Sequence, residues 1–157
     1  MDTTISHKTL YNEYYRYYTM NIIDIIQRNH FIKQLYPGGI SNIAVVSFST
    51  DLINFVLKVR TDTKPAIKIA KWGEWLTDYD IVEIELRNNY IKDISCSNWW
   101  NNTKCNCLID IHDIGDDLKK IRFYSIIENW YLEIAVHSLT FQGCKVYLKS
   151  QEDYYAI

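Results

Sequence analysis

Apolar and polar residues alternate through most of the chain after Gly39, and this alternation constrains the fold more than any other feature. A repeat of two places apolar side chains on one face of a β-strand and polar side chains on the other. The pattern predicts about eight short strands, over residues 43–48, 52–60, 80–86, 91–98, 105–112, 118–126, 130–136 and 145–149. A briefer strand is predicted at 67–69. Because hairpin-length loops separate these segments, we expect consecutive strands to pair antiparallel.

Residues 7–36 contain no glycine or proline, and apolar residues recur there at helical spacing. The stripe consists of Tyr11, Tyr15, Tyr18, Ile22 and Ile25. Ser6 suits an N-cap, and Pro37 is a stop signal. The weak helix propensity of Asn29-His30 makes it the expected site of any internal break. This pattern predicts a long N-terminal helix at about 7–36, packed on a mostly antiparallel meander sheet at about 40–150. The expected fold is a single α+β domain spanning 1–157.

Length and charge narrow the functional classes. A chain of 157 residues can bury a core without disulfide or metal support. A net charge of −2 argues against affinity based on neutralising nucleic-acid phosphates. The sequence contains neither a secretory leader pattern nor an apolar run long enough for a membrane span. We therefore expect a cytoplasmic protein without nucleic-acid or membrane partners, in which all four cysteines are reduced thiols.

The sequence contains no pattern typical of catalysis or of cofactor binding. Cys105 and Cys107 fall on the same side of a predicted strand and would start a zinc site with Cys96 or His112, but no second cysteine pair follows. The acidic loop at 113–117 lacks the spacing of a calcium-binding loop. We expect a protein that is not an enzyme and has no catalytic residues, metal or cofactor.

Four tryptophans fall at strand ends or in turns: Trp72, Trp75, Trp99 and Trp100. At such positions a large ring either packs against the sheet or serves as an exposed contact for a partner. Asp78 and Tyr79 lie close by in sequence, so the segment at 72–80 is our candidate for an exposed recognition loop. The predicted partner-binding residues are Trp72, Trp75, Asp78, Tyr79, Glu83, Glu85, Trp99 and Trp100.

Acidic residues occupy the polar positions of several predicted strands, namely Glu83, Glu85, Asp110 and Glu133. If these side chains share a solvent-exposed face, that face complements a basic partner such as a nuclease domain. An uncovered sheet edge would also allow a homodimer.

The stretch from Lys71-Trp72 through residues 79–86 (Tyr-Asp-Ile-Val-Glu-Ile-Glu-Leu) to residues 91–94 (Ile-Lys-Asp-Ile) resembles small bacterial immunity proteins of polymorphic and contact-dependent toxin systems. The resemblance implies a compact cytosolic α+β domain that binds and blocks one toxin domain. The tyrosine-rich N-terminal segment is not part of it. Two alternatives remain open. One is a viral or mobile-element inhibitor of a host defence factor. The other is a small-ligand-binding protein or enzyme with a pocket inside a curved sheet, near His112, His137 or Asp110.

Overall fold

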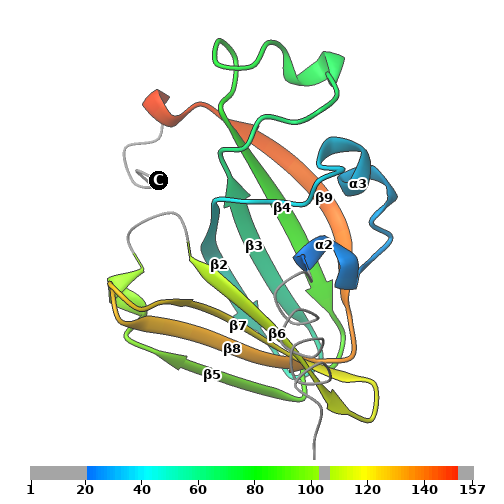
Figure 1. Ribbon diagram of the computed structural model, residues 1–157, viewed down its shortest axis with the longest axis vertical. Coiled ribbons are helices and arrows are strands. Elements are labelled where there is room, and N and C mark those ends of the chain that lie inside the picture. The colour runs from blue at the N-terminus through cyan, green and yellow to red at the C-terminus, as the bar shows by residue number, and fades with distance from the viewer. Residues whose placement is uncertain (1–20, 103–106, 152–157) are drawn as a thin grey trace, which may run out of the picture.

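The computed structural model describes residues 21–102 and 107–151, and this part of the chain is mostly β-structure (Figure 1). Two sheets form. In the first, the strand order is β1 (Ile26–Gln27), β9 (Leu139–Tyr147), β4 (Ile81–Asn88), β3 (Phe55–Thr61) and β2 (Ile43–Thr50). In the second, the order is β5 (Asp93–Ser97), β8 (Trp130–Val136), β7 (Leu118–Ser125) and β6 (Leu108–Gly115).

Neighbouring strands pair antiparallel throughout, except for the parallel pair β1 and β9. The prediction of mostly antiparallel pairing is confirmed, but the prediction of one meander sheet is wrong. After β4 the chain turns into the second sheet, where β5 pairs with β8. It returns to the first sheet through His137 and Ser138 alone, and β9 then pairs with both β4 and β1. Alternation marks strands without revealing these non-local partners.

The prediction of a long N-terminal helix is also wrong, and with it the α+β class. Residues 7–20 lie outside the described residues. From residue 21 onward the α-helices are α2 (Ile22–Ile25) and α3 (His30–Leu35), with β1 between them. Three short segments form 3₁₀ turns: η1 (Ala70–Trp72), η2 (Trp99–Asn101) and η3 (Lys149–Gln151).

Three local features interrupt the predicted helix. The side chain of Asn21 caps α2 and accepts a hydrogen bond from the Ile23 amide at 3.2 Å. Ile26 then pairs with Leu139 of β9, so sheet hydrogen bonds replace helical ones. Arg28 follows with a left-handed φ of 57°, which ends the strand. The interruption covers residues 26–29, so the predicted break at Asn29-His30 falls at its end, where α3 begins.

The apolar faces of both sheets and of both helices contribute to one hydrophobic core. In Figure 1, α2 and α3 lie over the first sheet beside β4 and β9, and the second sheet crosses the lower part of the molecule. Leu57 and Leu86 of the first sheet, Leu35 of α3 and Phe123 of the second sheet are completely buried. No helix among the described residues is both long enough and apolar enough to cross a membrane.

Candidate functional site

The predicted recognition loop at 72–80 packs its aromatic rings inward. Trp72 and Tyr79 are buried, at 7 % and 3 % exposed, and Trp75 is half-buried. Tyr79 makes edge-on contacts with both tryptophans, at centroid distances of 5.8 Å to Trp72 and 5.2 Å to Trp75. Trp72 also packs edge-on against Phe31 of α3 at 6.1 Å. These rings therefore fasten the loop to the core, because edge-to-face aromatic pairs stabilise a fold beyond the area they bury.

Asp78 has a structural role in the same loop. Its carboxylate accepts a hydrogen bond from the Glu74 amide at 2.7 Å. This bond closes the loop over Gly73, whose φ of 84° is left-handed. The exposed apolar residue of the loop is Leu76, which was not among the predicted partner-binding residues.

The predicted acidic face is largely neutralised. Glu83 does not lie on a solvent face as predicted. It is 5 % exposed and forms an ion pair with Arg60, directly opposite on β3, at 2.8 Å. Glu85 pairs with Arg87 at 3.0 Å. Glu133 lies 3.7 Å from Lys120 and 3.8 Å from Arg122. The fourth predicted acidic residue, Asp110, is opposite Arg122 in the pairing of β6 with β7. Cations on the neighbouring strand thus compensate Glu83 and Glu133, and a cation on the same strand compensates Glu85.

Trp99 and Trp100 differ sharply in environment. Trp99 is half-buried, and its ring packs edge-on against Phe48 at 5.1 Å and Trp130 at 5.9 Å. Trp100 is 92 % exposed. Of the predicted aromatic contacts, Trp100 is therefore the one whose ring is available to a partner.

The turn between β7 and β8 brings two further apolar side chains to this end of the second sheet. Ile126 is 76 % exposed and Ile127 is 92 % exposed. The Asn101 side chain joins η2 to this turn by a hydrogen bond to the Asn129 carbonyl, and Figure 1 shows the two segments side by side. The prediction of a strand over 118–126 missed these residues. The sequence signal for the end of this strand was the isoleucine pair, because two adjacent apolar residues break the apolar–polar alternation just before Glu128.

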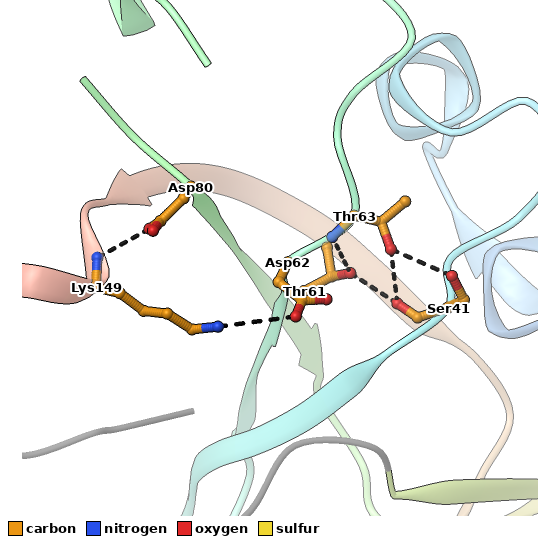
Figure 2. A network of polar contacts seen from close by, with 6 residues as sticks. All are labelled: Ser41, Thr61, Asp62, Thr63, Asp80 and Lys149. Carbon is orange, nitrogen blue, oxygen red and sulfur yellow. Dashed lines mark hydrogen bonds and ion pairs between the residues drawn. The ribbon is translucent and has the colours of Figure 1, made fainter. Parts of the chain in front are cut away.

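Polar side chains at the upper end of the first sheet form a structural network (Figure 2). Thr61 donates its hydroxyl to the Ser41 carbonyl at 2.7 Å. Asp80 accepts a hydrogen bond from the Lys149 amide at 2.8 Å, and the Lys149 ammonium lies 3.8 Å from Asp62. The network ties the ends of β3 and β9 to the start of β4.

The residues considered for metal or acid–base chemistry are not gathered together. Cys96 lies on β5 and Cys107 immediately precedes β6, and these are the opposite edge strands of the second sheet. Two strands separate them, so at strand spacings of about 4.8 Å they cannot share a zinc ion. Cys105 lies outside the described residues. His112 is on β6, whereas His137 is in the β8–β9 turn. Among the described residues, no cluster of three or more histidine, cysteine or carboxylate side chains is arranged to hold a metal ion.

Comparison with models of known protein families, with curated proteins and with solved structures found no match for this chain.

Proposed function

We propose that this is a non-catalytic binding protein, and that it contacts a protein partner through the exposed apolar end of the second sheet. We call this region the Trp100 surface and define it as Trp100, Leu108, Ile126 and Ile127. The observation that carries the proposal is the exposure of these four side chains, which is 50 % or more for each. Leu108 belongs to this end of the sheet because it begins β6 opposite Tyr124, near the end of β7. Clustered apolar exposure is typical of protein-binding sites, and tryptophan is prominent among residues that dominate binding energy.

The support beneath Trp100 favours recognition of a folded partner. Trp99 is fixed between Phe48 of the first sheet and Trp130 of the second. The Asn102 side chain donates a hydrogen bond to the Val45 carbonyl at 2.8 Å, which attaches the end of η2 to β2. A surface held in place before binding loses less conformational entropy on association.

For the partner, we propose a bacterial toxin domain that is blocked by direct contact, as the resemblance to immunity proteins implies. The pairing of Glu83, Glu85 and Glu133 with cations removes the electrostatic argument for a basic partner. The proposal therefore rests on apolar contact and leaves the charge of the toxin domain unspecified.

The experiment is co-expression with the product of the adjacent upstream gene, scoring growth rescue and co-purification. We expect rescue and a one-to-one complex with the wild-type protein, and loss of both with Trp100→Ala or Ile127→Ser. Leu52→Ser is the matched control, because Leu52 is equally exposed but lies in the β2–β3 turn.

Two results would contradict the proposal. One is failure of the wild-type protein to rescue growth or form a complex. The other is self-association of the purified protein that Trp100→Ala abolishes, which would assign the Trp100 surface to a second copy of this chain.

A further inference from the structure

A polar cleft of about 510 Å³ lies at the opposite end of the second sheet from the Trp100 surface. Five segments meet there: the end of β1 with Arg28, the residue before β3, the end of β4 with its following turn, the β8–β9 turn, and the first half of β9. The volume falls within the range of small-ligand sites, about 300–1,000 Å³. None of the residues predicted to bind a partner lines this cleft, although Glu85 is ion-paired with Arg87, which does.

The floor of the cleft is set by sheet register. Thr140 of β9 is paired with Gln27 of β1 on one side and with Arg87 of β4 on the other. Side chains at paired positions point to the same face of a sheet, so these three groups lie in one row across adjacent strands. The row places an amide, a hydroxyl and a guanidinium side by side.

The cleft is lined by two arginines, one of which is already paired with a carboxylate outside the lining. Arg28 and Arg87 are among its lining residues, whereas no carboxylate is, among the residues that the structure describes. Arg28 is exposed and forms no ion pair within the described part of the chain. Arg87 directs Nε and Nη2 to one Glu85 oxygen, at 3.1 and 3.0 Å, and its Nη1 is not used in that pair.

The rim of the cleft is held by backbone-directed hydrogen bonds. Asn88 donates its side-chain amide to the Ser138 carbonyl, which joins the end of β4 to the β8–β9 turn. The side-chain Oδ1 of Asn88 accepts a hydrogen bond from the Tyr90 backbone amide at 2.6 Å. Tyr90 itself is 72 % exposed at this rim. The cleft thus has a fixed frame with an accessible aromatic ring at one side.

We propose that this cleft binds the phosphate group of a small phosphorylated ligand of nucleotide size. Guanidinium groups match phosphate oxygens in geometry and charge. The Arg28 guanidinium and the Nη1 of Arg87 are the charged donors that the Arg87–Glu85 pair leaves for a ligand. Thr140 and the neighbouring amides supply further hydrogen-bond donors. The Tyr90 ring offers a stacking face for a base or a similar planar group.

The test is titration of the isotopically labelled protein with adenosine monophosphate, inorganic phosphate and adenosine, followed by amide chemical shifts. We expect both phosphate-containing probes to shift resonances of residues 87–90 and 137–140, and adenosine to bind at least about tenfold more weakly than its monophosphate. Arg28→Gln and Arg87→Gln should each weaken binding of the monophosphate by about tenfold, the loss expected for one charge-assisted hydrogen bond.

Arg122→Gln is the matched control, because Arg122 is a half-buried arginine of β7 that pairs with Glu133 and does not line the cleft, so its loss should leave binding unchanged. Thermal melting of each variant separates loss of binding from loss of folding. Absence of shifts with either phosphate probe, equal binding of adenosine, equal competition by acetate, or wild-type affinity in both cleft variants would overturn the proposal. The Trp100→Ala variant should bind the monophosphate normally, so this test is independent of the proposed protein partner.

Discussion

The Arg60 guanidinium lies 2.8 Å from the Glu83 carboxylate, and the two side chains are only 5 % and 6 % exposed. The residues face each other across β3 and β4. Arg60 also lies over the ring of Tyr147, with its central carbon 4.3 Å from the ring centroid. The alternation in the sequence predicts that both charged side chains face solvent. Because they are buried instead, the loss of either partner should lower the free energy of unfolding.

Glu83→Ala should lower the free energy of unfolding by about 3 kcal/mol, because it leaves a guanidinium buried without this carboxylate. Chemical denaturation measures the change. Glu85→Ala is the control, since its pair with the exposed Arg87 is expected to contribute less than about 1 kcal/mol. Equal losses in the two variants would show that burial of the Arg60–Glu83 pair has no special weight.

The two adjacent tryptophans should separate stability from binding. Trp99→Ala should destabilise the fold by about 2 kcal/mol, because its ring packs between the sheets. Trp100→Ala should change the unfolding free energy by no more than about 0.5 kcal/mol, since its ring is exposed. Thermal or chemical denaturation of both variants tests this. A large loss of stability in Trp100→Ala would contradict the description of Trp100 as a surface contact.

Gly73→Ala should destabilise the protein by about 2 kcal/mol, through strain at a left-handed φ and a clash. An added Cβ would lie 2.7 Å from the Cβ of Asp78, which the Glu74 amide holds in place. Gly115→Ala is the matched control. Its φ of 85° is similar, but an added Cβ meets no atom within 4 Å, so we expect a loss of about 1 kcal/mol. If the denaturation midpoints of Gly73→Ala and Gly115→Ala fall by the same amount, the clash with Asp78 makes no contribution.

Burial raises the pKa of the Cys144 thiol from its ordinary value of 9 to about 12. The folded state therefore favours the neutral thiol, and the unfolded state releases its proton first as the pH rises. The stabilisation is fully present below pH 9 and is lost progressively between pH 9 and 12, by up to about 1.4 kcal/mol for each pH unit.

Cys144→Ala should flatten this alkaline decline when unfolding free energy is measured between pH 8 and 11. Burial also raises the pKa of Tyr36, so a shared decline above pH 10 should remain in both proteins. Cys96→Ala is the control, because Cys96 is exposed and its pKa is raised less strongly by burial. An unchanged pH profile in Cys144→Ala would contradict burial of this thiol.

Much of the strand arrangement could be predicted from local pattern. The prediction at 130–136 coincides with β8, and that at 43–48 falls within β2. The helical stripe failed from residue 21 onward because β9 offers Ile26 a strand partner about 110 residues away in sequence, and such a partner overrides weak local helix propensity. The predicted strand at 67–69 likewise has no counterpart.

The predicted site was recovered only in part. Strand-end position correctly drew attention to Trp100, but the same argument selected Trp72 and Tyr79, which are buried against each other. Whether a ring at a strand end is buried depends on neighbours such as Phe31 that local sequence does not identify. Of the residues that line the polar cleft, only His137 was a candidate from the sequence, since Arg28 and Arg87 come from segments far apart in sequence.

The sequence by itself determined that apolar and polar side chains would occupy opposite faces of short antiparallel strands, because that follows from the two-residue period of an extended chain. Only the tertiary structure decided that those strands divide into two sheets, that Glu83 lies buried with Arg60, and that Trp100 stays exposed. Each of these depends on which distant strand a segment pairs with. The free energy of that choice comes from burial and pairing across the whole fold.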